Sequence, residues 1–162
     1  MTKITVEKWS KQWAIDFNHD IPLALNNICA HCARIAHNYA KDNFRLQGFN
    51  GDNGIEKWAP RKKKYAWSIL NHTGQLKKSL QEETHKGKGR SVARVYTDSK
   101  AFLGFNYAAF HNQPSGTYSR PYPSIQRQFI GYSREIEDDL FTVFKNFFIN
   151  TLPGGRNDPF YI

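Results

Sequence analysis

The stretch IPLALNNICAHCARIAHNY, residues 21–39, decides the fold because it carries the clearest apolar periodicity in the chain. Its apolar residues recur at intervals of four, three, four, three and four positions: Ile21, Leu25, Ile28, Cys32, Ile35 and Tyr39. This spacing puts all of them on one side of an α-helix. The polar face comprises Asn27, His31, Arg34, Asn38 and Lys41. We predict a long helix with Asp20 as its N-cap and Pro22 in its first turn, ending before Gly48.

The chain on either side of this helix predicts a second helix and a long loop. Residues 5–17 place Trp9 and Trp13 one turn apart, which favours a shorter helix before the main one. The run Asn-Gly-Asp-Asn-Gly at residues 50–54 is typical of turns. We therefore predict a long irregular segment over residues 49–66, interrupted by a short helix over residues 64–70.

Strand patterns follow Gly74. Residues 91–97 alternate between two sets of side chains, as a half-buried strand does. They follow residues 75–85 across a turn rich in glycine, which predicts a β-hairpin. A third strand at residues 101–105 completes the predicted small antiparallel sheet. Prolines and glycines then mark a second long loop over residues 111–123.

A second amphipathic pattern predicts a C-terminal helix capped by Ser133. Acidic side chains in its first turns complement the positive end of the helix dipole. Its apolar side comprises Ile136, Leu140, Val143, Phe144, Phe147 and Phe148. The predicted fold class is therefore α+β, with a long N-terminal helix, a small antiparallel sheet with a hairpin, a C-terminal amphipathic helix and two long loops. Residues 1–152 form the single predicted domain, and residues 153–162 form a C-terminal tail.

The composition indicates a folded, strongly basic protein. The chain has 162 residues, 40% of them hydrophobic and 15% aromatic, and a net charge of +9. Such a charge favours nucleic acid, an acidic protein surface or anionic lipid as a partner. No stretch reaches the roughly 20 apolar residues of a membrane span, and no signal peptide is recognisable. We therefore expect a cytoplasmic protein without a membrane partner.

No residue pattern indicates catalysis or a cofactor. Cys29 and Cys32 form a C-x-x-C pair, but Cys32 lies on the apolar stripe and no second ligand pair follows at zinc-finger spacing. We interpret both as small buried thiols. The six histidines lack a nucleophile elbow, a metalloprotease motif or a phosphate-binding loop beside them. We therefore expect no enzyme, no metal and no cofactor, although a small hydrolase using a histidine and a carboxylate stays open as a third interpretation.

Basic residues gather in two places. Arg61, Lys62, Lys63 and Lys64 form the densest run, beside Trp58, Tyr65 and Trp67, and Lys86, Lys88 and Arg90 lie on the predicted hairpin turn. Lysine and arginine neutralise phosphates while aromatic rings stack on unpaired bases. The possible DNA or partner contacts are Trp58, Arg61, Lys62, Lys63, Lys64, Lys86, Lys88 and Arg90. The alternative interpretation is a solvated loop whose Trp58 folds back onto the core.

Three blocks of sequence, in this order, are similar to those of a known family. The first runs from Trp58 through the turn LNHTGQL, residues 70–76; the second is YAAFH, residues 107–111; the third is QRQFIG, residues 126–131. With a helix before and a helix after, the chain resembles the phage virion morphogenesis family, which comprises tail-completion and head–tail joining proteins such as that of phage Mu. The matching positions are Trp58, Leu70, Thr73, Gly74, Leu76, Tyr107, Ala108, His111, Arg127, Phe129 and Gly131. Gln128 departs from the pattern, which has proline there.

This resemblance implies a non-enzymatic protein that completes the phage tail or joins it to the head. It implies other head–tail or tail proteins as partners and a homo-oligomeric ring of about six subunits. It also implies assembly in the host cytoplasm and a place in the tail or neck of the virion, and the net charge of +9 with the run Arg61 to Lys64 motivates the hypothesis of non-specific contact with DNA. The alternative is a free-standing basic nucleic-acid-binding domain, which should hold DNA or RNA at moderate salt.

Overall fold

The structure, a computed structural model, describes residues 6–87, 90–97, 107–117 and 125–151. The elements in chain order are α1 (Val6–Leu46), β1 (Gly48–Gly51), β2 (Gly54–Lys57), α2 (Gln75–Lys78), β3 (Leu80–Gly87), β4 (Arg90–Thr97), α3 (Tyr107–Asn112) and α4 (Arg134–Thr151). The predicted α+β class is confirmed, although the strands form two antiparallel pairs, β1–β2 and β3–β4, instead of one sheet. The predicted third strand at residues 101–105 and the tail at residues 153–162 lie outside the described residues.

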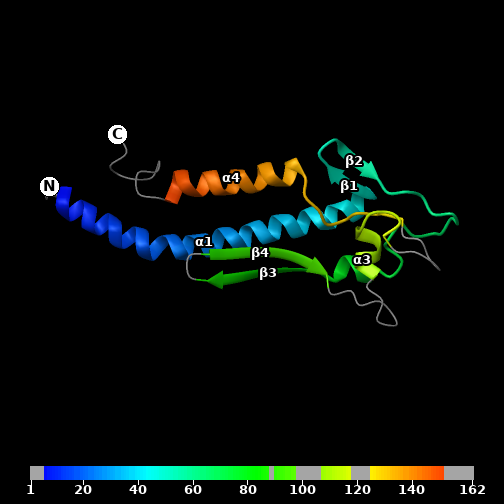
Figure 1. The fold of residues 1–162 in the computed structure, drawn as a ribbon, viewed down its shortest axis with the longest axis horizontal. Coiled ribbons are helices and arrows are strands. Elements are labelled where there is room, and N and C mark those ends of the chain that lie inside the picture. Colours follow the sequence, from blue (N-terminus) through cyan, green and yellow to red (C-terminus); the bar gives the residue numbers. More distant parts are fainter. Residues whose placement is uncertain (1–5, 88–89, 98–106, 118–124, 152–162) are drawn as a thin grey trace.

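Helix α1 is longer than predicted. The two helices expected over residues 5–17 and from Asp20 onward are one helix of 41 residues, because no glycine or proline interrupts the chain between Val6 and Asp20. The predicted N-terminus at Asp20 is therefore wrong, and Pro22 lies inside α1. An internal proline removes one backbone hydrogen bond and bends a helix, and α1 is curved toward its N-terminal end in Figure 1. The helix spans roughly 60 Å.

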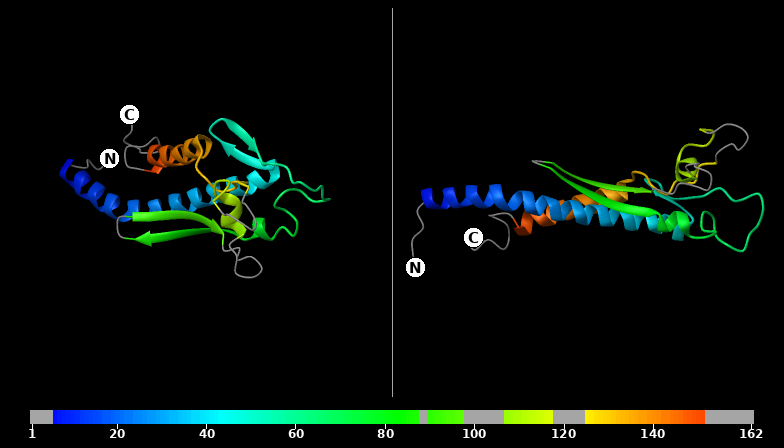
Figure 2. Two further views of the ribbon diagram at one scale, coloured as in Figure 1. Left: turned by 45° about the vertical axis from the view of Figure 1, so that its right-hand side comes forward. Right: turned by 90° about the horizontal axis from the view of Figure 1, so that it is seen from below.

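Helix α1 is the middle layer of the fold. Figures 1 and 2 show α4 along one side of it and the β3–β4 hairpin along the other. The predicted apolar stripe faces α4: Ile28 and Cys32 are buried, and the hydroxyls of Tyr39 and Ser133 share a hydrogen bond of 2.6 Å. The predicted core side of this helix is thereby confirmed for the part whose side chains are described, which begins at Pro22.

A second buried line on α1, which the periodicity analysis did not identify, faces the β3–β4 hairpin. Ala33 and Ala40 are buried along it, and such small side chains let a hairpin approach the helix closely. His37 Nε2 lies 3.1 Å from the carbonyl oxygen of Leu80, and its Nδ1 lies 3.3 Å from a carboxylate oxygen of Glu82. Helix α1 is thus buried on two sides, and only its remaining face is polar.

A tight hairpin follows α1 directly, so the prediction of an irregular segment from residue 49 is wrong for its first part. Gln47 ends the helix with a positive φ of 53°, and β1 begins at Gly48. A Cβ at Gly48 would lie 2.6 Å from the carbonyl oxygen of Glu56, so only glycine allows β2 this close. Strands β1 and β2 pair in register from Gly48 with Lys57 to Gly51 with Gly54. The short helix predicted over residues 64–70 does not form.

The second hairpin confirms the predicted pairing around the glycine-rich turn. Strands β3 and β4 pair over their full length, from Leu80 with Thr97 to Gly87 with Arg90. The first residues of the predicted strand instead form the short helix α2, which Gly74 precedes with a φ of 69°. A left-handed backbone at this point suits glycine and turns the chain into α2.

Ser133 caps α4 as predicted. It is fully buried, its hydroxyl oxygen lies 3.5 Å from the backbone N–H of Ile136, and its carbonyl accepts from the backbone N–H of Glu137 at 3.2 Å. Asp52 adds a second contact by accepting from the backbone N–H of Arg134 at 2.7 Å. The predicted apolar side is correct for Ile136, which is buried, but Phe144 is 37% exposed. The side chain of Phe148 lies outside the described residues.

Among the described helices, none combines the length and the apolar composition needed to cross a lipid bilayer.

Candidate functional site

The three sequence blocks meet in one hydrophobic core at the C-terminal end of α1. This core comprises Ala40, Phe44, Trp58, Leu70, Leu76, Leu80, Ala108 and Phe129. Phe44 lies between two of the blocks, with ring centroids 5.5 Å from Trp58 and 5.2 Å from Phe129. Five of the family-like positions are thus packed side chains, and their burial accounts for their apolar character.

Trp58 belongs to this core and does not face a partner. Its indole N–H donates to the carbonyl oxygen of Gln128 at 2.7 Å, and its backbone N–H donates to the carbonyl oxygen of Gln47 at 2.9 Å. Its assignment to the possible DNA or partner contacts is corrected, because a buried ring with its N–H already bonded has no free surface to offer. The alternative interpretation, in which Trp58 folds back onto the core, describes its position.

Asn112 joins the second and third blocks. Its Oδ1 accepts from the backbone N–H groups of Phe129 and Ile130, both at 2.9 Å. Its Nδ2 donates to the carbonyl oxygen of Ile130 at 2.9 Å. One side-chain amide therefore acts as a strand partner for the segment that carries Phe129. The residue directly follows the second block, residues 107–111, but nothing in the sequence distinguishes it from a surface asparagine.

Asn43 of α1 and Gln47, the residue that follows α1, make similar connections. Asn43 is fully buried, donates from Nδ2 to the carbonyl of Phe129 at 3.2 Å, and accepts from the backbone N–H of Asn50 at 3.0 Å. Gln47 accepts from the backbone N–H of Ile69 at 2.6 Å. Sequence reasoning missed both residues. A polar residue on a predicted helix is expected to be exposed when its hydrogen-bond partner is far away in the sequence.

His111 and Arg127 form the polar part of the same region. The backbone N–H of Arg127 donates to the carbonyl of His111 at 2.7 Å, and its Nε donates to the carbonyl of Ala59 at 3.2 Å. His111 is 8% exposed, and Nδ1 has no hydrogen-bond partner within the described residues. Burial and, to a smaller extent, the charge of Arg127 lower the pKa of His111 to about 4, although a hydrogen bond with the backbone of Ile125 acts in the opposite direction. His111 is therefore neutral at physiological pH.

The remaining family-like positions shape the backbone. Leu70 has a positive φ of 57°, which is uncommon for a residue other than glycine. Thr73 accepts from the backbone N–H of Gln75 at 3.3 Å through its hydroxyl and so supports the start of α2. A Cβ at Gly131 would lie 2.9 Å from Cζ of Phe49 and closer still to the Gln128 side chain, so this position excludes larger residues. Tyr107 is the exception, since its ring is partly exposed beside that of His111 at 4.5 Å.

The segment between β2 and α2 extends beyond the C-terminal end of α1, as Figures 1 and 2 show. Its backbone is held by Arg61, whose guanidinium donates to the carbonyl of Trp67 at 2.9 Å and to that of Ser68 at 2.5 Å. The same guanidinium lies 5.5 Å from the ring centre of Tyr65 and 6.0 Å from that of Trp67. Arg61 is therefore a structural clamp for this segment as well as a charge.

Three rings stack along this segment. Tyr65 and Trp67 are 4.8 Å apart at an interplanar angle of 25°, and Trp67 and His72 are 4.1 Å apart at 31°. Lys62, Lys63 and Lys64 are exposed next to the stack. We call residues 61–72 the basic loop. Sequence reasoning found its charges and two of its aromatic residues, but not that His72 completes the stack.

The structure does not bring the two basic sites together. Lys86 and Arg90 are exposed at the tip of the β3–β4 hairpin, which points away from the basic loop and lies beside the middle of α1 (Figure 1). Lys88 lies outside the described residues. A single ligand footprint covering both predicted sites would therefore have to run the length of the hairpin.

The cysteine pair lies in the middle of α1. Cys32 is buried, as predicted, and burial raises its pKa, with the neighbouring Cys29 thiol adding to the effect. Cys29 is only half-buried. In the described part of the chain, no three histidine, cysteine, aspartate or glutamate side chains come together as a metal site. The pair thus has the character of thiols in a helix packing face.

Comparisons of this chain with protein-family models, with curated proteins and with solved structures found no match.

Proposed function

We propose that this chain is a non-enzymatic virion morphogenesis protein of a tailed phage, which completes the tail or joins it to the head as a ring-forming subunit. The observation that supports the proposal is the convergence of the three family-like blocks, residues 58–76, 107–111 and 126–131, on one core at the end of α1. Blocks that are far apart in sequence are expected to meet in this way when they define a shared fold. By this proposal the protein acts in the host cytoplasm during assembly and then in the tail or neck.

The roles of the block residues support an assembly protein more than a catalyst. Trp58 and Phe129 pack, Gly74 and Gly131 shape the backbone, and Arg127 bonds to backbone carbonyls. General acid–base catalysis needs a titratable group with a pKa near the working pH and within reach of a substrate. His111 meets neither condition, because it is buried and its pKa is about 4.

The shape of the molecule also suits a subunit of a larger particle. A helix of 41 residues, a hairpin and α4 lie along one axis, and the basic loop extends from one end (Figure 2). Identical subunits in a closed ring use two different surfaces for each contact. An elongated chain with distinct features at its end and along its side provides such surfaces. Basic side chains lining a ring would contact passing DNA weakly and without reading bases.

The test is mass spectrometry of phage particles purified after prophage induction from the source strain. We expect peptides of this chain at a few copies per particle. A matched deletion of the gene should yield heads and tails that do not join, or tails that stay incomplete, and the wild-type gene should restore infectious particles. Normal particles from the deletion strain, with no peptides of this chain in the virion, would contradict the proposal.

A second candidate function, binding of single-stranded nucleic acid, is favoured by the stack of Tyr65, Trp67 and His72 beside three lysines. Stacked aromatic rings with adjacent basic residues are a common platform for unpaired bases. Fluorescence anisotropy with a labelled oligonucleotide over a salt series tests it. A dedicated binder should hold the oligonucleotide at moderate salt, lose affinity steeply as salt rises, and bind less when Trp67→Ala removes the centre of the stack.

A further inference from the structure

Negative charge is concentrated at the start of α4. Four of the five residues from 135 to 139 are acidic, in a chain whose net charge is +9. All four of them are exposed: Glu135, Glu137, Asp138 and Asp139. Capping and the helix dipole favour acidic residues in the first turn, but they do not require two more in the second. This concentration is therefore a feature of the surface as well as of the helix.

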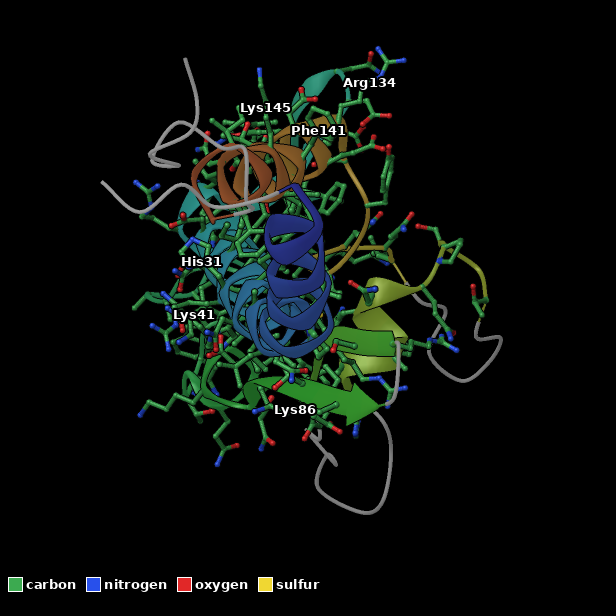
Figure 3. The ribbon with its side chains drawn as sticks, turned by 90° about the vertical axis from the view of Figure 1, so that its left-hand side faces the viewer. His31, Lys41, Lys86, Arg134, Phe141 and Lys145 are labelled. Atoms are coloured by element: carbon green, nitrogen blue, oxygen red, sulfur yellow. The ribbon has the colours of Figure 1, made fainter. Side chains whose placement is uncertain are left out.

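Two large aromatic rings lie exposed on the same surface. Phe141 is 67% exposed, one helical turn after Glu137, and Tyr132 is 64% exposed and donates its hydroxyl hydrogen bond to the Glu137 carboxylate. Figure 3 shows Phe141 on the side of α4 that faces away from α1. We call this surface the α4 patch: Tyr132, Glu137, Asp138 and Phe141, with the Glu135 and Asp139 carboxylates further around the same helix. A phenylalanine and a tyrosine this exposed among carboxylates are typical of a surface that another protein covers.

The basic loop has the complementary composition. The basic loop, residues 61–72, contains four lysines and arginines and no acidic residue, and no acidic residue occurs in the wider segment 57–81. Within the loop, Lys62, Lys63 and Lys64 are exposed beside Tyr65, whose ring is 52% exposed. The loop therefore presents positive charge around an aromatic surface, and the α4 patch presents negative charge around another aromatic surface.

The two surfaces cannot meet within one chain as it is folded. The basic loop extends past the end of α1, whereas the α4 patch begins beside the β1–β2 hairpin and follows α4 along the flank of α1. They are apart in each view of Figures 1 and 2. Two complementary surfaces at separate places on one molecule allow a head-to-tail contact between copies.

We infer that the basic loop of one copy of this chain docks on the α4 patch of a second copy. The inference rests on the proposed function and gives it the repeating contact that a ring needs, since a heterologous contact repeats until the ring closes. The aromatic rings form the centre of the contact, and the opposite charges surround it and set its orientation. Binding of nucleic acid to the loop alone would account for the lysines but would leave Phe141 and Tyr132 in water.

The experiment uses two charge reversals in the full chain. One variant carries Lys62→Glu, Lys63→Glu and Lys64→Glu, and the other carries Glu137→Lys, Asp138→Lys and Asp139→Lys. Sedimentation velocity over a concentration series measures association of the wild type and of each variant at low and high salt. We expect each variant alone to associate about tenfold more weakly or worse, and wild-type association to weaken as salt screens the charges.

An equal mixture of the two variants is the decisive sample. In the mixture the loop of each variant meets a patch of opposite charge on the other variant, so association in which the two variants alternate should return to the wild-type level. A matched control carries Lys86→Glu, Arg90→Glu and Arg94→Glu on the β3–β4 hairpin. It changes the net charge of the chain by the same amount as the loop reversal and should associate like the wild type. Circular dichroism and thermal melting confirm that each variant is folded before it is compared.

Three outcomes overturn the inference. The first is a wild type that stays monomeric at every concentration, and the second is association that neither reversal weakens. The third is a mixture of folded variants that fails to associate. This includes the case in which the loop reversal alone weakens association and also abolishes oligonucleotide binding, which would assign the loop to nucleic acid. None of these outcomes decides the proposed function, which depends on the presence of the chain in purified particles and on the deletion phenotype.

Discussion

The indole N–H of Trp58 donates to the backbone carbonyl of Gln128 at 2.7 Å and so joins two sequence blocks that lie 70 residues apart. The bond lies beside the ring contacts of Phe44 with Trp58 and Phe129, so the segment after β2 and the segment before α4 share one anchor on α1. The basic loop begins three residues after Trp58, and α4 begins six residues after Gln128. This bond therefore holds together the segment that leads into the basic loop and the segment that leads into α4, which carry the two surfaces that we propose to be functional.

Two substitutions of Trp58 should distinguish the contribution of its packing to the free energy of unfolding from that of its hydrogen bond. Trp58→Phe keeps an aromatic ring but leaves the Gln128 carbonyl without this donor, which should cost about 1–3 kcal/mol of unfolding free energy. Trp58→Ala also leaves a cavity and should cost about 3–5 kcal/mol. Urea denaturation measures both. Phe141→Ala, at a side chain that is 67% exposed, serves as the control and should change the free energy by about 0.5 kcal/mol or less; an equal cost for Trp58→Ala and Phe141→Ala would contradict the burial of Trp58.

Loss of the Asn112 side-chain acceptor should lower the free energy of unfolding more than loss of its side-chain donor. Asn112→Ala leaves the backbone N–H groups of Phe129 and Ile130 without their partner and should cost about 2–4 kcal/mol. Asn112→Asp keeps an acceptor for both groups, loses the bond to the Ile130 carbonyl and places a second oxygen opposite that carbonyl, which costs less than leaving two N–H groups unpaired. Denaturant midpoints should therefore rank the wild type first, Asn112→Asp second and Asn112→Ala last. The reverse order of the two variants would show that the amide does not hold this segment.

Ser133 should contribute to stability through both of its contacts. Ser133→Ala removes the cap of α4 and the partner of the Tyr39 hydroxyl, and we expect a loss of about 1–2 kcal/mol. Tyr39→Phe removes the bond between the two hydroxyls but keeps the cap, so it should cost less. The exposed Thr142→Ala, within the same helix, is the control. Thermal melting of the three variants checks the ranking, and a Thr142→Ala variant as unstable as Ser133→Ala would argue against the cap.

His111 should make the protein less stable in mild acid. Its pKa is lowered from 6.5 to about 4 in the folded chain, so the unfolded chain binds more protons between these values. The contribution of neutral His111 is fully present above pH 6.5 and is lost as the pH falls toward 4, by an amount on the order of 3 kcal/mol. Urea denaturation at a series of pH values measures this slope.

The non-titrating variant His111→Gln should show a shallower pH dependence over that window than the wild type. An NMR titration of the histidine ring provides an independent measurement of the same pKa. A ring that titrates near 6.5 in the folded protein would contradict the effect of burial.

Much of the fold was predictable because its signals are local. The apolar spacing from Leu25 to Tyr39 and the glycine-rich turn before Arg90 each depend on neighbours within a few positions, and the structure confirms the helix and the hairpin that they predict. The cap at Ser133 is equally local. The predicted start at Asp20 failed because proline favours a first turn but is tolerated inside α1 at the cost of one backbone hydrogen bond, and the residues before Pro22 continue the helix.

The candidate site depended on contacts that no local pattern records. Sequence reasoning identified the charges of the basic loop, but it assigned Trp58 to that surface, whereas the structure places Trp58 in the core. The roles of Asn43 and Asn112 were invisible, because each is polar in a setting where polar residues are usually exposed. Phe144 was assigned to the core from its spacing, yet among the described residues α4 packs along α1 on one side, and the edge of its apolar side is partly exposed there.

The sequence by itself determined the class of the fold, the amphipathic faces of α1 and α4, and the two concentrations of opposite charge, since these follow from composition and spacing along the chain. Only the tertiary structure decided that α1 is buried on two sides, that the three blocks meet around Phe44, and that Phe141 and the basic loop are left exposed at separate places. The physical reason is that burial and hydrogen bonding between distant segments depend on which surfaces pack together, and that choice is made by the whole chain at once.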